Sequence, residues 1–125
     1  MTGAAMGSIE IRGLRVMCHV GVPEAERAVP QPIEFDLDLV VDLDAAASSD
    51  LVSDTVDYGA VSEAVAAAVT SGPHALLERL AGLAADAALA VDQRSVAVSV
   101  TVRKLRPPVP VDVATTAVRL HRARS

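Results

Sequence analysis

Tyr58, Glu78 and Lys104 could together transfer protons without the help of a metal ion. They supply a phenol, a carboxylate and an ammonium group, which are all groups used in acid–base catalysis. Tyr58 is the only tyrosine in a chain that is 2% aromatic, and it follows Asp57, where a loop is predicted to lead into a helix. Functional side chains often stand at such junctions, so Tyr58 is a candidate site residue and not simply core filler.

Composition limits the classes of protein to which the chain can belong. Its 125 residues suit one domain, and a formal net charge of −5 argues against a nucleic-acid surface. One cysteine, Cys18, allows no intramolecular disulfide and suits a reducing cytoplasm. No segment is long and apolar enough to span a membrane, and the start of the chain lacks the features of a signal peptide. We expect a cytoplasmic domain over residues 8–122, preceded by a loose tail over 1–7.

The spacing of apolar residues predicts an α+β fold. Apolar residues at alternate positions predict strands, over residues 9–17, 32–44, 95–104 and 113–122. Apolar residues at helical spacing predict helices, over about 58–70 and 74–91, with a short helical turn over 45–50. Strands grouped with strands and helices with helices favour a four-stranded antiparallel sheet with two helices on one face.

Details of this pattern bear on the candidate residues. Gly13 interrupts the first strand where its alternation slips, which predicts a β-bulge. Asp57 is a suitable N-cap for the first helix. Lys104 shares the phase of the valines before it, so its side chain should point to the buried side at the end of a strand. Glu78 should lie about 160° from the apolar stripe of the second helix. That stripe is predicted to comprise Leu76, Leu80, Leu83 and Ala87.

Short motifs follow one another along the chain on the predicted elements. They are Gly21-Val22-Pro23-Glu24-Ala25-Glu26-Arg27 with Gln31, Ser49-Asp50, Asp54-Thr55-Val56-Asp57-Tyr58, Leu76-Leu77-Glu78, and Lys104 with Pro107-Pro108-Val109-Pro110. In this order and spacing they resemble the dihydroneopterin aldolases of folate biosynthesis, which have the tunnelling fold. The resemblance covers residues 8–122. It implies a carbon–carbon lyase that cleaves 7,8-dihydroneopterin into 6-hydroxymethyl-7,8-dihydropterin and glycolaldehyde, with no metal, Schiff base or organic cofactor.

The resemblance also implies a role for each candidate residue. Lys104, Tyr58 and Glu26 would be catalytic, with Lys104 helping to deprotonate a substrate hydroxyl and Tyr58 serving proton transfer at the side-chain carbon. Glu78 would accept hydrogen bonds from the ring amide and exocyclic amine of the pterin. Further substrate-binding residues would be Leu77, Val56 and Thr55.

Each of these residues also has a plainer structural interpretation. Lys104 could extend its ammonium group to the rim of the core, and Tyr58 could pack on the sheet. Glu26 could form a weak ion pair with a neighbouring arginine, and Glu78 could simply be solvated.

The resemblance implies a homo-oligomer, in which a ring of four subunits closes the sheets into a barrel and two rings stack into an octamer. The active sites would lie between subunits. An epimerase of the same fold, acting on dihydroneopterin or its triphosphate, is an alternative, because cleavage followed by re-addition inverts the same carbon. A non-catalytic pterin-binding oligomer is the alternative from another class.

Overall fold

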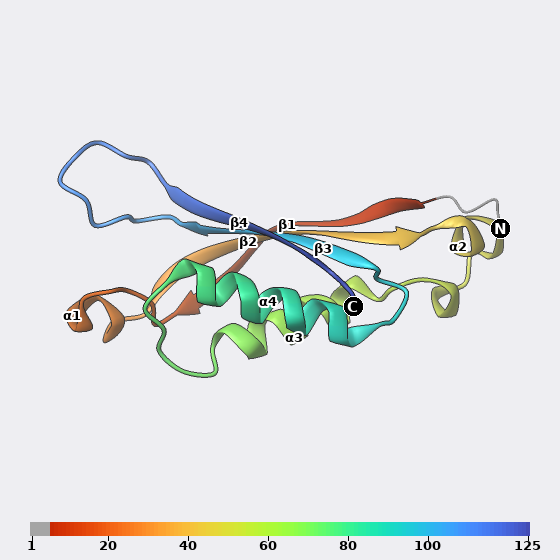
Figure 1. Cartoon of the computed structure of the whole chain (residues 1–125), viewed down its shortest axis with the longest axis horizontal. Helices are drawn as coiled ribbons and strands as arrows, with labels where there is room; N and C mark the ends of the chain where they lie inside the picture. Colours follow the sequence, from red (N-terminus) through yellow and green to blue (C-terminus); the bar gives the residue numbers. More distant parts are fainter. Residues whose placement is uncertain (1–5) are drawn as a thin grey trace.

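The computed structural model describes residues 6–125, and its centre is one antiparallel sheet with the strand order β1-β2-β3-β4. The strands are β1 (Met6–Cys18), β2 (Gln31–Asp42), β3 (Ala97–Lys104) and β4 (Thr116–Ala123). Two helices, α3 (Tyr58–Val69) and α4 (Leu77–Val91), lie together against one face of this sheet (Figure 1). The predicted α+β architecture and its order of strands and helices are confirmed.

Three short helical segments connect these elements. They are α1 (Glu24–Arg27), α2 (Asp44–Ser49) and the 3-10 helix η1 (Val52–Asp54). Segment α1 lies near one end of the sheet and α2 near the other (Figure 1). The sequence predicted the turn at α2 but no helical segment at α1.

Strand β1 is longer than predicted and contains the expected bulge. Gly13 has a φ of 71°, and the β1–β2 register shifts between Ile11 and Leu14. A left-handed φ favours glycine, because a Cβ atom would clash with its own backbone. The strand begins at Met6, so Met6 and Gly7 belong to the sheet and not to the predicted tail. The rest of that tail, residues 1–5, lies outside the described residues.

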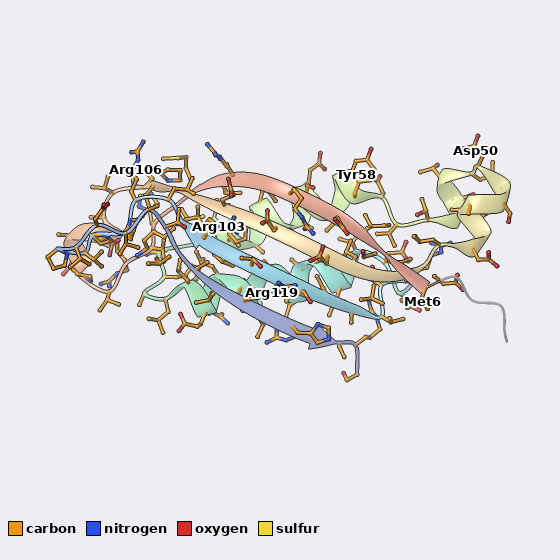
Figure 2. The ribbon with its side chains drawn as sticks, turned by 90° about the horizontal axis from the view of Figure 1, so that it is seen from above. Met6, Asp50, Tyr58, Arg103, Arg106 and Arg119 are labelled. Carbon is orange, nitrogen blue, oxygen red and sulfur yellow. The ribbon has the colours of Figure 1, made fainter. Side chains whose placement is uncertain are left out.

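The core forms between the helices and the helix-facing side of the sheet. Alternate β2 side chains from Ile33 to Val41 are fully buried, as are Val98, Val100 and Val102 of β3. The opposite face of the sheet is charged (Figure 2). There, acidic β2 residues pair with arginines of neighbouring strands, including Arg12 with Asp38 at 2.6 Å and Arg103 with Glu34 at 2.6 Å. The alternation therefore separates a dry face from a charged face, as expected.

Helix α3 begins where the sequence predicts it. Asp57 Oδ1 accepts hydrogen bonds from the backbone N–H groups of Gly59 and Ala60, at 2.9 and 3.2 Å. This N-cap satisfies donors that have no partner within the helix.

Helix α4 differs from the prediction in both its start and its buried face. It begins at Leu77, because His74 is held in an isolated parallel bridge with Val20. Leu76, predicted to be in the apolar stripe, is 49% exposed. The buried residues of α4 are Leu80, Ala81, Ala84, Ala85, Ala88 and Leu89. At 100° per residue, Glu78 lies about 70° from the centre of this face, on its flank and not opposite it.

The last two strands are shorter than predicted. Val96 precedes β3 and is 46% exposed, although it was expected to be buried, and β4 begins at Thr116 instead of 113. Residues 105–115 form the exposed connection between these strands, and its prolines cannot donate to a strand ladder. Among residues 6–125 no helix has the length and apolar character needed to cross a membrane.

Candidate active site

An ion pair joins α1 to the end of β3. Lys104 Nζ lies 3.0 Å from Glu26 Oε2, and the two side chains are only 14% and 17% exposed. Lys104 pairs in register with Ile33 of β2, whose side chain is buried, so the ammonium group enters from the helix-facing side of the sheet. The inward direction predicted for Lys104 is therefore observed, and its partner comes from 78 residues earlier in the chain.

Gln31 makes a second contact with the same carboxylate oxygen. Its Nε2 donates to Glu26 Oε2 at 3.1 Å and to the Val20 carbonyl oxygen at 2.9 Å. Partial burial alone would raise the pKa of the Glu26 carboxyl. The hydrogen bonds from Gln31 and Lys104, together with the charge of Lys104, outweigh burial and leave this pKa below its ordinary value. Glu26 is therefore held as an ionised hydrogen-bond acceptor.

The start of α4 lies at the same end of the sheet. The Gly21 N–H donates to the His74 carbonyl at 3.0 Å, and the His74 N–H donates to the His19 carbonyl at 2.9 Å. These bonds tie the segment before α4 to the segment before Glu26. Glu78 is exposed in the first turn of α4, where the positive end of the helix dipole favours a carboxylate. Leu77, the first residue of the helix, is half-buried.

Tyr58 belongs to a different pocket, which we call the Tyr58 pocket. Its volume is about 500 Å³ and its lining residues are Ile9, Glu10, Val52, Thr55, Val56, Asp57 and Tyr58. Val56 is fully buried beneath it, whereas Tyr58 is 67% exposed. The structure thus brings together Tyr58, Thr55 and Val56, which were the predicted site residues of this segment.

The two groups lie at opposite ends of the sheet. Ile9, in the Tyr58 pocket, pairs with Leu39, whereas Lys104 pairs with Ile33. These β2 positions are six residues apart, which corresponds to about 20 Å along a strand. Figure 2 shows Arg106, which follows Lys104 closely, at one end of the sheet and Tyr58 well away from it, towards the end marked by Met6. One copy therefore holds two separate sets of polar groups, and Tyr58 cannot reach Lys104 within it.

Other features of this region were not predicted from the sequence. Gln31 appeared only as part of a motif, with no role assigned to it. A further pocket of about 470 Å³ is lined by His19, Glu24, Arg27, Ala28 and Pro73. Across residues 6–125, no group of three or more His, Cys, Asp or Glu side chains is arranged to hold a metal ion. The composition also distinguishes Lys104, a feature that the sequence analysis did not use. It is the only lysine in a chain whose other strongly basic residues are all arginine.

The sequence model of the family described as dihydroneopterin aldolase (FolB) matches residues 9–121. The chain belongs to this family. A dihydroneopterin aldolase of Streptococcus pyogenes serotype M3 is 34% identical over 119 residues, which cover 95% of this chain and all of the relative.

Solved structures agree with this assignment. The crystal structure of Escherichia coli dihydroneopterin aldolase in complex with neopterin has a TM-score of 0.84 and 30% identity, covering 94% of this chain and 99% of the other. A Burkholderia thailandensis dihydroneopterin aldolase bound to guanine has a TM-score of 0.79 and 26% identity, covering 96% and 93%. The predicted family, fold and function, that of a dihydroneopterin aldolase and hence a lyase, are confirmed by these matches.

Proposed function

We propose that the chain cleaves 7,8-dihydroneopterin at a site shared between two subunits. The observation that carries the proposal is the separation of the Glu26–Lys104 pair from the Tyr58 pocket by about 20 Å along β2. One copy offers two incomplete sets of groups, and a second copy can complete each of them. The products would be 6-hydroxymethyl-7,8-dihydropterin and glycolaldehyde.

Glu78 and Leu77 would bind the pterin ring. Neopterin and guanine, the molecules named for the two related crystal structures, share an amide N–H beside an exocyclic amine. A carboxylate accepts from such a pair with both oxygens at once. Glu78 is an exposed carboxylate at the start of α4, and the hydrogen bond from the Gly21 N–H to the His74 carbonyl ties the segment before this helix to the turn beneath Glu26, which suits this role. Thr55 and Val56 of the second subunit would contact the ring from the other side.

The Glu26–Lys104 pair would remove the proton from the hydroxyl next to the bond that breaks. An ammonium group stabilises the developing alkoxide, and the proton leaves by way of a bound water to the ionised Glu26 carboxylate. The alkoxide becomes the carbonyl of glycolaldehyde as the carbon–carbon bond breaks. The electron pair of that bond moves into the adjacent ring imine and gives an enamine anion, whose negative charge lies on the ring nitrogen.

Tyr58 of the second subunit would complete the reaction. Its phenol donates a proton to the side-chain carbon of the enamine anion, which restores the imine and gives the hydroxymethyl product. Glu26 then releases to solvent the proton it took up, and the phenolate takes a proton from solvent, so both groups return to their starting states. The substrate itself is the electron acceptor in this scheme, so neither a metal ion nor a Schiff base takes part. The ion pair with Glu26 supports a role for Lys104 that involves no covalent bond to the substrate. An ammonium group bound to a carboxylate is a proton donor and not a nucleophile.

The assembly would be a ring of four subunits, stacked in pairs as an octamer. Strands β1 and β4 are the two edges of the sheet, and pairing between copies would satisfy their outer backbone groups. In such a ring, Lys104 of one subunit would lie near the Tyr58 pocket of the neighbouring subunit. The single buried cysteine suits the reducing cytoplasm that we propose as its location.

Product analysis tests this function directly. Purified protein is assayed with 7,8-dihydroneopterin in the presence of a chelator, and a second sample is first treated with substrate and borohydride, freed of both, and then assayed in the same way. We expect glycolaldehyde release in both conditions and no reduced adduct on Lys104, the only lysine. Conversion to monapterin without glycolaldehyde would identify an epimerase instead. Loss of activity on chelation, or borohydride inactivation through Lys104, would contradict the proposed chemistry.

A further inference from the structure

The Glu26 carboxylate is fixed by more than its ion pair. Gln31 Nε2 donates to the same oxygen, Oε2, that accepts from Lys104 Nζ, at 3.1 and 3.0 Å respectively. The second donor position of that amide is used by the Val20 carbonyl at 2.9 Å. A primary amide has two N–H donors, so the Gln31 amide cannot turn without losing one of these bonds. Gln31 itself begins β2 and pairs with Cys18, so its backbone is set by the sheet.

The backbone beneath Glu26 is also adapted to this carboxylate. Gly21 is buried, and a Cβ atom at this position would clash with Glu26 Oε1 and would lie 2.5 Å from Cδ and 2.6 Å from Cγ. Any side chain at residue 21 would therefore push the carboxylate from its position. Arg27 does not bind Glu26. It donates to the carbonyls of Gly21 and Val22, at 3.0 and 2.7 Å, and so holds the same turn closed.

We propose that Gln31 is a positioning residue, which commits Glu26 Oε2 to Lys104 and, with Oε1 lying against buried Gly21, fixes the orientation of the carboxylate beside the ammonium group. The inference rests on the proposed function for its catalytic meaning, but the arrangement itself can be measured without substrate. A carboxylate free to rotate would divide its oxygens between Lys104, water and substrate. Because Gln31 belongs to β2, its hydrogen bond to Oε2 restricts rotation of the Glu26 carboxylate and so fixes the position of Oε1 as well.

The test uses the full chain with methionine at residue 31. Gln31→Met keeps the length of the side chain but removes both donors, and Gln93→Met is the matched control at the other glutamine, which is exposed in a turn. Glutamate side chains labelled with ¹³C are titrated by NMR in the protein alone, with Glu26→Gln identifying the Glu26 signal. Cleavage of 7,8-dihydroneopterin is measured in parallel.

We expect Gln31→Met to raise the titration midpoint of Glu26, because a hydrogen bond to the ionised form is lost. We also expect kcat to fall about tenfold with KM changed by less than about twofold, because orientation is lost and the ring-binding groups are intact. Gln93→Met should match the wild type in both measurements. Gly21→Ala should shift Glu26 in the same direction as Gln31→Met, and it replaces that variant if the latter does not fold.

An unchanged Glu26 midpoint in folded Gln31→Met protein would overturn the inference, even if activity fell. A shifted midpoint with unchanged kcat would overturn it as well, since the hydrogen bond would then have no catalytic consequence. If the wild type releases no glycolaldehyde, the proposed function fails by itself. The titration still decides in that case whether Gln31 fixes the carboxylate.

Discussion

The variant Lys104→Met measures how much the largely buried Glu26–Lys104 ion pair contributes to stability. The Lys104 and Glu26 side chains are 14% and 17% exposed, and Nζ lies 3.0 Å from Oε2. Exposed pairs contribute about 0–1 kcal/mol, whereas removing one partner of a fully buried pair costs about 3–5 kcal/mol. The pair keeps some solvent contact, and Gln31 would still donate to the carboxylate. We therefore expect Lys104→Met to lower the free energy of unfolding by about 1–3 kcal/mol at pH 7.

This loss should depend on pH with a definite sign. Burial opposes ionisation of Glu26, but the hydrogen bonds from Gln31 and Lys104 and the charge of Lys104 leave its pKa lowered in the folded state. A lowered pKa stabilises the fold above the ordinary glutamate pKa of about 4.3, and this contribution is lost as the pH falls through the folded value. The difference between wild type and variant should thus be largest near pH 7 and should shrink below about pH 4.

Urea denaturation at neutral and acidic pH provides the assay, at one fixed protein concentration because assembly contributes to apparent stability. Arg15→Met is the matched control, since Arg15 pairs with Glu34 at 3.1 Å but is 66% exposed. Its effect should stay within about 0.5 kcal/mol. The reasoning is refuted if Lys104→Met costs no more than this control, or if its cost is undiminished at acidic pH.

Three further predictions concern the elements that position the site. Asp57→Ala should lower the free energy of unfolding by about 1 kcal/mol, because two N–H groups of α3 lose their acceptor, whereas Asp112→Ala in the exposed β3–β4 connection should have no such effect in the same urea titration. Gly13→Ala should lower the free energy of unfolding by about 1–2 kcal/mol and therefore lower the melting temperature, because residue 13 has a φ of 71°. The added Cβ would meet nothing within 4 Å, so the backbone conformation is the only source of this effect, and an unchanged melting temperature would contradict it. Burial raises the pKa of the Cys18 thiol to about 11, so iodoacetamide at pH 8 should label native protein far more slowly than urea-unfolded protein, and equal rates would contradict this burial.

The sheet could be predicted from the sequence because each strand carries its own pattern. Alternation from Ile33 to Val41 matches the buried face of β2, and the slip at Gly13 matches the bulge. These features depend on neighbours in sequence and on the period of two residues along a strand. Asp57 was predictable for the same reason, since a cap acts within the first turn of its own helix.

Helix α4 was misjudged where tertiary structure overrides the local pattern. The bridge between Val20 and His74 keeps residue 74 extended. The residues around His74 do not indicate this bridge, because its partner lies more than fifty residues earlier in the sequence. The buried face of α4 consists largely of alanines, whereas the prediction followed the larger leucines. Small residues allow close packing of helix on helix and sheet, but they give a weak apolar pattern.

The candidate site was predictable residue by residue but not as an arrangement. The phase of Lys104 indicated its inward direction, yet its contact with Glu26 arises only when α1 folds against the end of β3. The role of Gln31 depends on the Val20 carbonyl and the Glu26 carboxylate meeting at one amide. Neither contact has a sequence signature, because each joins segments that local patterns treat separately.

Subunit complementation tests the shared site most directly. Copies carrying Tyr58→Phe and copies carrying Lys104→Met, each expected to lower turnover at least ~10-fold alone, are co-expressed in equal amounts and purified as mixed assemblies. If each site takes Lys104 from one subunit and Tyr58 from another, about a quarter of the sites regain both groups, and activity should return to about a quarter of the wild-type value. Mixed assemblies as inactive as either parent would contradict the account, because every site would then be built within a single chain.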